Sequence, residues 1–362
     1  MSKQIKLFSV AISLFMVAVG ASFLYFSNVY LHKGFSRDTT EVLIDVVPGQ
    51  TMLTVAKTLQ DKGIIANAKI FNWYARYTGK SSKLKKGEYA VNAVMTPDQI
   101  LAIVTSGKSV ARNFTVAEGL NIFDIASLVE KSGYGTKQDF MQIVHDKAFI
   151  KSLLGEDLES LEGYLFPETY KVTKFDTTKD IITQMVNRFL STAATLKSDL
   201  DNFNLTHPQR KWTRHQWVTF ASIVEKETGA PHERNLVSSV FHNRLNINMR
   251  LQTDPTVLYG QAVLRGEMPL NITRNDLLTP TRYNTYTIYG LPPAPISNPG
   301  REALLAALQP AQSKYLYFVS KNDGTHTFSE SLEAHNSAVK TFQLNPKARE
   351  GKSWRDLKNK TK

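Results

Sequence analysis

Two glutamates at the end of an apolar segment are the residues that first suggest chemistry. The segment ASIVEKETGA covers residues 221–230 and carries Glu225 and Glu227 among Ala, Ile and Val. A carboxyl among apolar side chains has its ionised form disfavoured, so its pKa rises. Such a glutamate stays protonated near neutral pH and can act as a general acid. The alternative is an ordinary solvated or ion-paired couple of charges.

A helix must position this pair. Thr213 and Gln216 have the spacing of a capping box at a helix start, and Gly229 marks the end. At about 100° per residue, Glu225 and Glu227 both fall within the apolar arc, on opposite flanks and roughly 160° apart. Carboxyls that diverge in this way do not form the facing pair of ordinary glycosidases. The spacing does not choose between the two glutamates.

Polar and aromatic residues follow in two stretches punctuated by Pro and Gly. The first, MRLQTDPTVLYG, covers 249–260, and the second, LTPTRYNTYTIYGLPPAPISNPG, covers 278–300. Tyrosine offers an apolar face with a hydrogen-bonding tip, and Asn, Gln and Thr both donate and accept, which suits sugars and other hydroxyl-rich ligands. An irregular structural loop is the alternative interpretation of these stretches.

The composition excludes several classes of site. The chain has no cysteine, so it has no disulfide, thiolate nucleophile or cysteine metal site. Its eight histidines show no metal-ligand spacing, and the Gly-rich phosphate-binding motifs are absent. Lys and Arg exceed Asp and Glu by 44 − 32 = +12, which favours anionic partners. No nucleic-acid-binding module accompanies this charge, so nucleic acid is not expected as a partner.

The N-terminal segment 7–31 carries no charged residue. As a helix it would span roughly 37 Å, enough for a tilted bilayer crossing. Lys3 and Lys6 precede it, which predicts a cytoplasmic N-terminus and an exported remainder. A cleaved signal peptide is the alternative, but the apolar run is longer than such a segment needs. We therefore expect an uncleaved transmembrane helix that contacts the lipid bilayer.

The rest of the chain predicts an α+β fold. Strands are expected at 41–47 and 87–92, and helices at 50–63, 70–79, 95–107, 176–196 and 232–245. Residues 197–213 are polar and loop-like. The stretches 47–63 and 116–133 share a frame of Gly and apolar positions, which indicates either two ordinary strand–turn–helix units or a repeated module. The expected organisation is a cytoplasmic N-terminus at 1–6, the helix at 7–31, a small α/β unit at 41–110, a mixed region at 111–345 and a basic tail at 346–362.

Several motifs, taken in order, closely resemble one family. They are EGYLFPETY at 162–170, ASIVEKET at 221–228, F-x-N-R-L at 241–245, RLQTDPTVLYG at 250–260, YNTYTIYGLPP at 283–293 and ISNPG at 296–300. This set resembles the endolytic murein transglycosylase (YceG-like) family of bacterial cell-wall enzymes. The resemblance implies a LysM-like subdomain at 41–110 and a catalytic region at 111–345.

The resemblance also implies the reaction. The family cleaves the β-1,4 bond between N-acetylmuramic acid and N-acetylglucosamine in nascent strands, and its catalytic glutamate falls on Glu225. Protonated Glu225 would donate to the glycosidic oxygen and then accept the proton of the C6 hydroxyl, which closes a 1,6-anhydro ring without water. The substrate-binding candidates are Gln252, Asp254, Tyr283, Asn284 and Tyr286. Glu227 is expected to be supporting, and Asp254 could instead be a turn residue ahead of Pro255.

The implied setting is the bacterial inner membrane, with the catalytic region in the periplasm. Peptidoglycan glycan strands are the expected substrate, penicillin-binding proteins of wall elongation are the implied partners, and no metal or cofactor is implied. Two alternatives stay open. A hydrolytic muramidase would use a second acid such as Asp254 to activate water and would leave reducing ends. A membrane-anchored scaffold would bind glycan for the cell-wall synthases without cleaving it.

Overall fold

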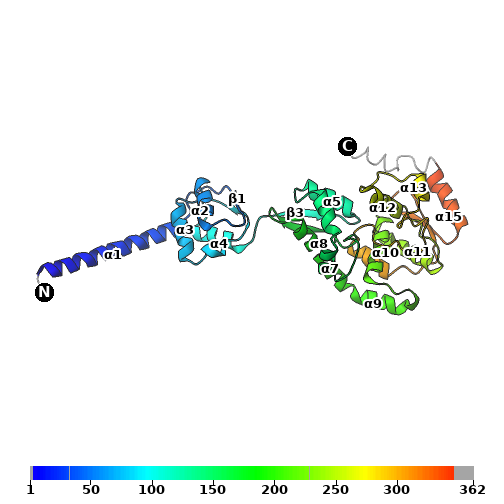
Figure 1. The fold of residues 1–362 in the computed structure, drawn as a ribbon, viewed down its shortest axis with the longest axis horizontal. Coiled ribbons are helices and arrows are strands. Elements are labelled where there is room, and N and C mark those ends of the chain that lie inside the picture. Colours follow the sequence, from blue (N-terminus) through cyan, green and yellow to red (C-terminus); the bar gives the residue numbers. More distant parts are fainter. Residues whose placement is uncertain (1–2, 32, 228, 346–362) are drawn as a thin grey trace. The chain divides into compact units, whose positions relative to one another are not determined.

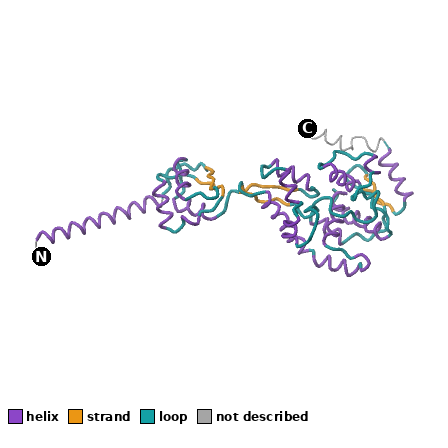
Figure 2. The backbone as a smooth tube through the Cα atoms, in the orientation of Figure 1, coloured by secondary structure: helices purple, strands orange, loops and turns teal. Residues whose placement is uncertain are grey.

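The protein is mixed α+β, with short two-stranded sheets among many helices, and the α+β class expected from the sequence is confirmed. This computed structural model describes residues 3–31, 33–227 and 229–345, so the predicted basic tail at 346–362 lies outside the described residues. The chain divides into two compact units, Met1–Arg112 with Lys171–Phe175 and Asn113–Tyr170 with Asp176–Lys362. Figure 1 labels their elements, and Figure 2 shows how short the strands of each unit are.

The N-terminal segment forms one long helix, α1 (Lys3–Leu31). Its described apolar side chains lie open to solvent, with Phe8 71% exposed and Phe15 68% exposed. In the part of the chain that the structure describes, no helix combines the length and the apolar character that crossing a membrane requires. The segment 7–31 is thus helical as expected, but its assignment as a membrane span is not supported by this finding.

The first unit builds a small core between two strands and three helices. The elements are β1 (Val42–Val46), α2 (Met52–Asp61), α3 (Ala68–Tyr77), η1 (Ser81–Lys83), β2 (Gly87–Val91) and α4 (Pro97–Ser106). β1 and β2 pair antiparallel with Ile44 opposite Tyr89, and Phe71 and Ile100 lie in the same buried cluster. An isolated pair of strands is marginally stable in water, so the helices must supply its apolar cover. The helices and strands expected in this region are confirmed to within a turn of their ends.

β3 (Ala111–Val116), within which the chain passes from the first unit to the second, pairs with β4 (Glu168–Thr173). The helices of this part are α5 (Ile122–Lys131), α6 (Lys137–Val144), α7 (Lys147–Leu154), α8 (Thr178–Thr195) and α9 (Lys197–Thr206). α5 packs on α6, and α8 packs on α6, α7 and α9. The long helix expected at 176–196 is confirmed as α8.

The shared frame of two strand–turn–helix segments has a backbone cause. Gly49 and Gly119 enter their helices at φ +82° and +74°, and Gly63 and Gly133 leave them at +68° and +77°. These left-handed conformations carry a steric penalty for residues with a Cβ, which Gly avoids. Two ordinary units that need Gly at the same turns therefore account for the similarity of the two stretches.

The prediction of a loop at 197–213 is wrong for its first half, which is α9. Only Phe203 of this helix is buried, so no apolar periodicity marks it. The Phe203 ring stacks on Trp212 with centroids 4.5 Å apart, and Asn204 exchanges two hydrogen bonds with the Trp212 backbone. Tertiary packing can stabilise a helix that propensity and pattern leave unmarked.

The remaining elements of the second unit surround a buried helix, α10 (Arg214–Glu227). They are η2 (Pro208–Arg210), η3 (Pro231–Glu233), α11 (Arg234–Asn246), α12 (Asp254–Arg265), α13 (Arg274–Leu278), α14 (Arg301–Leu308), β5 (Tyr317–Ser320), β6 (His326–Ser329), α15 (Leu332–Val339) and the π-helical turn η4 (Lys340–Leu344). α10 begins at the predicted capping box of Thr213 and Gln216. Residues 217–224 are all buried, and the Trp217 indole donates to the Leu304 carbonyl of α14 at 2.8 Å. The helix expected at 232–245 is confirmed as α11.

Candidate active site

The last turn of α10 carries both glutamates and directs their side chains to different neighbours. Glu225 accepts a hydrogen bond from the Gly300 backbone N–H at 3.0 Å. Glu227 accepts one from the Thr253 hydroxyl. Gly300 precedes α14 and Thr253 precedes α12, so the two carboxyls meet different segments. The divergence predicted from helical spacing is therefore present in the folded chain.

Glu227 lines a cavity of about 530 Å³ within the second unit. Three of the predicted substrate-binding residues, Gln252, Asp254 and Tyr286, line it too. Further polar wall residues come from α11, β5, β6 and α15, namely Arg244, Tyr317, His326 and His335. A cavity of this size with convergent polar groups has the form of a ligand site.

Burial raises the pKa of the Glu227 carboxyl to about 7. The hydrogen bond from Thr253 acts against this shift, the nearby Asp254 carboxylate adds to it, and Arg244 opposes it. A carboxyl with a pKa near 7 is substantially protonated at neutral pH and readily gives up and regains its proton. Glu227 thus has the acidity that a single residue acting first as acid and then as base needs.

The rim beside Glu227 is held rigidly. Tyr286 donates its hydroxyl proton to Asp254 Oδ1 at 2.7 Å. Gln252 has a backbone φ of +49°, which is uncommon for a residue other than Gly. Its N–H donates to the Thr285 carbonyl at 3.2 Å, and the Thr253 N–H donates to the Thr285 hydroxyl at 3.0 Å. Backbone strain held by surrounding hydrogen bonds is typical of functional sites.

Tyr283 and Asn284, the other two substrate-binding candidates, do not line this cavity. Asn284 is fully buried, and its side-chain amide donates to the carbonyls of Leu277 and Thr279 at 3.0 and 2.8 Å. Tyr283 packs edge-on against Tyr259, with ring centroids 5.0 Å apart. Both residues support the loop that carries Tyr286, so their contribution to the cavity is indirect.

Glu225 occupies a different environment. Its side chain is 6% exposed, and a carboxylate oxygen lies 3.9 Å from Arg234 Nη2. Burial raises the pKa of Glu225, the Gly300 N–H acts against that shift, Glu118 adds to it and Arg234 lowers it. Glu225 is not among the residues that line the cavity beside Glu227. Its hydrogen bond and ion pair tie the end of α10 to the start of α14 and to α11.

Sequence reasoning missed the hairpin of β5 and β6 as part of the cavity. Phe318 faces Phe328 across this antiparallel pair, and the cavity wall includes Tyr317 and His326. Arg244, within the F-x-N-R-L motif, donates to the Leu316 carbonyl at 2.7 Å and so attaches the hairpin to α11. The only signal in the sequence was that motif, which does not reveal which segment the arginine reaches.

Among residues 3–31, 33–227 and 229–345, no three His, Asp or Glu side chains come together as a metal site requires. The side chains around Glu227 are a mixture of carboxyl, amide, phenol, imidazole and guanidinium groups, which matches hydrogen bonding to a hydroxyl-rich ligand better than coordination of a cation.

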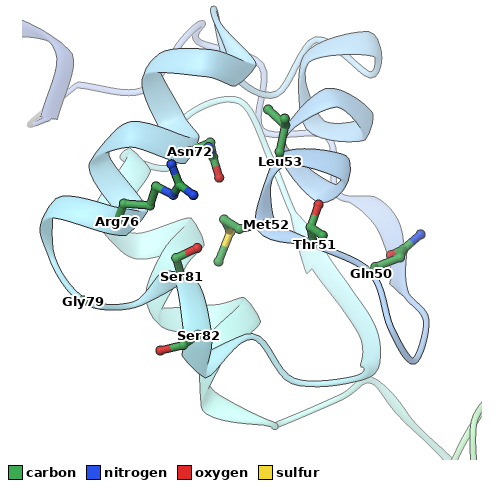
Figure 3. Close-up of a pocket in the computed structure, with 9 residues that line it drawn as sticks. All are labelled: Gln50, Thr51, Met52, Leu53, Asn72, Arg76, Gly79, Ser81 and Ser82. Atoms are coloured by element: carbon green, nitrogen blue, oxygen red, sulfur yellow. The ribbon is translucent and has the colours of Figure 1, made fainter.

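The first unit has a separate cavity of about 670 Å³ (Figure 3). The residues that line it are Gln50, Thr51, Met52, Leu53, Asn72, Arg76, Gly79, Ser81 and Ser82. Figure 3 shows the side chains of Asn72 and Arg76 on α3 across from those at the start of α2, with Met52 between them. Most of its lining residues are polar, and they come from the start of α2, from α3 and from the segment at η1.

Comparison with known proteins gives a consistent result. The sequence matches the model of the YceG-like family over residues 44–341. A Bacillus subtilis protein named endolytic murein transglycosylase is 33% identical over 340 residues, which cover 90% of this chain and 91% of that protein. A Streptococcus pneumoniae protein of the same name is 27% identical and is matched over 93% of this chain and 65% of its own length.

A solved structure also matches the fold. The crystal structure of a yceG-like protein from Listeria monocytogenes aligns with a TM-score of 0.56 and 34% sequence identity. The alignment covers 83% of this chain and all of that one. Both the sequence and the arrangement of elements therefore point to the same group of proteins.

Proposed function

Because the chain belongs to the YceG-like family, we propose that it is a lytic transglycosylase that cleaves peptidoglycan glycan strands internally. The relatives named endolytic murein transglycosylase support the substrate and the reaction class. The cavity beside a buried, weakly acidic glutamate supports the chemistry. The scissile bond is the β-1,4 bond between N-acetylmuramic acid and N-acetylglucosamine, and the product ends are 1,6-anhydro sugars.

We assign the acid to Glu227, whereas the family resemblance implied Glu225. Three observations support this assignment. Glu227 lines the cavity with Gln252, Asp254 and Tyr286, its pKa is near 7, and its carboxyl is held by the Thr253 hydroxyl. Glu225, by contrast, is engaged by a backbone N–H and lies close to an arginine.

The reaction needs one carboxyl in two roles. Protonated Glu227 donates its proton to the glycosidic oxygen as that bond breaks, and positive charge develops at the muramoyl anomeric carbon. The Asp254 carboxylate, whose charge already influences Glu227, stabilises that positive charge. Ionised Glu227 then accepts the proton of the C6 hydroxyl of the same sugar, while the C6 oxygen attacks the anomeric carbon. The proton returns to Glu227, and no water is consumed.

Product analysis tests the proposal. The full chain in detergent is incubated with purified glycan strands, beside the Glu227→Gln and Glu225→Gln proteins, and the new ends are weighed by mass spectrometry. Ends one water lighter than the hydrolytic product, absent with Glu227→Gln and present with Glu225→Gln, are expected. Loss of activity in Glu225→Gln alone would return the acid to Glu225.

The same experiment distinguishes the two alternative functions. Reducing ends would mean a hydrolytic muramidase, with Asp254 as the residue that activates water. Strands that bind but stay intact in the wild-type protein would indicate a glycan-binding scaffold for cell-wall synthases. Each of these outcomes would replace the lytic mechanism.

The cellular setting is also proposed. Residues 7–31 would anchor the protein in the bacterial inner membrane, with the N-terminus in the cytoplasm and the catalytic region in the periplasm. The uncharged sequence of this segment, the preceding Lys3 and Lys6 and the exposed apolar side chains of α1 support this. Extraction of the protein from membranes by an alkaline wash would contradict it. Penicillin-binding proteins of wall elongation are the partners that co-purification should test.

The first unit is proposed to be a LysM-like module that holds another stretch of the strand. The order β1–α2–α3–β2, the antiparallel pairing and the recess of Figure 3 support this role. Replacing Asn72 and Arg76 together by Ala should weaken strand binding by the inactive Glu227→Gln protein. Unchanged binding would remove the first unit from substrate recognition.

A further inference from the structure

His326 is far from α10 in the sequence, but it lines the same cavity as Glu227. It is the first residue of β6. Its Nδ1 lies 2.7 Å from Oε2 of Glu233, and its backbone N–H donates to Oε1 of the same carboxyl at 3.0 Å. One carboxyl therefore holds both the main chain and the ring of this histidine.

This contact determines which edge of the imidazole can meet a ligand. An ionised carboxyl only accepts, so the proton of a neutral His326 ring resides on Nδ1. Nε2, on the opposite edge of the ring, then has a lone pair. A carboxylate that orients a histidine in this way is a common device for presenting the second nitrogen to a ligand.

The ring is also fixed by its packing. The Phe318 ring meets it edge-on at 5.4 Å between centroids, and the Phe328 ring lies 6.4 Å away at 61°. The His326 side chain is 12% exposed and that of Glu233 is 6% exposed. A side chain held on several sides loses little further freedom when a ligand binds, which favours recognition.

The chain connection relates this pair to Glu227. Glu233, which orients His326, ends η3 and is six positions after Glu227 in the sequence. Glu227 and His326 line one cavity, so a ligand bound there has both side chains in its wall.

We propose that His326 is a substrate-binding residue of this site and that Glu233 is its positioning residue. His326 Nε2 accepts a hydrogen bond from a hydroxyl or acetamido N–H of the amino sugar beside the scissile bond. This inference rests on the proposed function, because it takes the occupant of the cavity to be a glycan strand.

Two substitutions separate substrate binding from a purely structural tie. In His326→Asn, the side-chain amide can still donate to Glu233 at the place of Nδ1, but nothing replaces Nε2. In His326→Gln, the longer amide reaches the place of Nε2 and loses the match to Glu233. His145→Asn is the matched control, because His145 is exposed and does not line the cavity.

The variants are compared by melting temperature, KM and kcat on purified strands. His326→Asn should melt near the wild-type temperature and raise KM roughly 10-fold, the loss of about one hydrogen bond, with kcat changed less. His326→Gln should recover part of the affinity, and His145→Asn should match the wild type. Wild-type KM in His326→Asn, with a lowered melting temperature in His326→Gln, would reduce the pair to a structural tie.

The Glu233→Gln variant provides a second test of the contact between Glu233 and His326. The Gln amide can donate to Nδ1, which transfers the ring proton to Nε2 and replaces its lone pair by a donor. KM should rise in this variant although the side-chain volume is unchanged. A Glu233→Gln protein with wild-type KM and melting temperature would contradict the positioning role.

A final comparison keeps this inference separate from the proposed reaction. If the wild-type protein cleaves no strand, the proposed function fails. The role of His326 is then tested by strand binding alone. The dissociation constant of Glu227→Gln for strands is then compared with that of the Glu227→Gln, His326→Asn double variant. A roughly 10-fold weaker double variant would support the contact without any catalysis, and equal constants would overturn it.

Discussion

Glu225 and Glu227 are two positions apart on one helix, yet they lie in two different sites. Glu225 receives the N–H of Gly300 and lies 3.9 Å from Arg234 Nη2. Glu227 lies against the Thr253 hydroxyl at the wall of a cavity. Burial raises the pKa of both carboxyls, so acidity alone does not distinguish them. They differ in that Glu227 lines this cavity and Glu225 does not. A raised pKa indicates a catalytic acid only when a substrate can reach the group.

The largest expected effect is on catalysis. Glu227→Gln should lower kcat by roughly 10²–10⁴-fold, the range for loss of a general acid or base, while Glu225→Gln should stay within about 10-fold of the wild type. The measurement is the initial rate of anhydro-end formation, with far-UV circular dichroism as the control for folding. Equal losses in the two variants would end the distinction between the two sites.

The same substitution should stabilise the protein above neutral pH. The pKa of Glu227 is about 7 in the folded chain against an ordinary value of 4.5, so the folded state binds the proton more tightly than the unfolded state. The free energy of unfolding therefore falls as pH rises from about 4.5 to 7, by up to ~3 kcal/mol. Glu227→Gln removes this cost, so its melting temperature should exceed that of the wild type at pH 8.

The gain in melting temperature should shrink towards pH 4.5, because the wild-type carboxyl is then protonated in both states. Thermal unfolding of both proteins from pH 4.5 to 8 measures it. A difference that is constant over this range would show that Glu227 does not titrate between those limits.

Removing the charge of Asp254 should move the pH profile. Asp254 raises the pKa of Glu227, so Asp254→Asn should lower that pKa and shift the alkaline fall of kcat/KM to lower pH. The profile of Glu225→Gln should keep the wild-type position. Complete loss of activity in Asp254→Asn at every pH would instead favour a hydrolase in which Asp254 activates water.

The smallest expected effect concerns the support of the cavity rim. Tyr286→Phe removes the hydrogen bond from Tyr286 to Asp254, and kcat/KM should fall by roughly 3- to 10-fold. Tyr289→Phe is the matched control, because Tyr289 is 58% exposed and stacks under Arg250 outside that contact. Similar losses in both variants would mean that the loop as a whole, rather than this bond, limits activity.

The sequence predicts much of the fold because local signals carry it. The capping box of Thr213 and Gln216 marks a helix start that the structure contains, and Gly at the ends of two strand–turn–helix units takes left-handed φ values. Where the local signal was weak, the prediction failed. α9 has one buried side chain, and its helix depends on the contact of Phe203 with Trp212.

The candidate site follows the same division. The motifs suggest Gln252 and Asp254 in one stretch and Tyr286 in another, and the structure brings all three to the cavity. They also suggested Tyr283 and Asn284, which hold the loop from behind. His326 gave no signal, because the hairpin that carries it is about 100 residues from α10 in the sequence and reaches the cavity through long-range contacts, among them those of Glu233 with His326 and of Arg244 with the Leu316 carbonyl.

The sequence by itself determined that Glu225 and Glu227 leave one helix on opposite flanks, because the helical repeat sets side-chain directions locally. Only the tertiary structure decided that the flank of Glu227 lines the cavity with Gln252, Asp254 and Tyr286. That outcome depends on Thr253 and Gly300, which belong to separate segments beyond the helix and which long-range packing brings to the two carboxyls. Local backbone geometry orients a side chain, whereas burial, charge and access come from neighbours that the chain supplies from elsewhere.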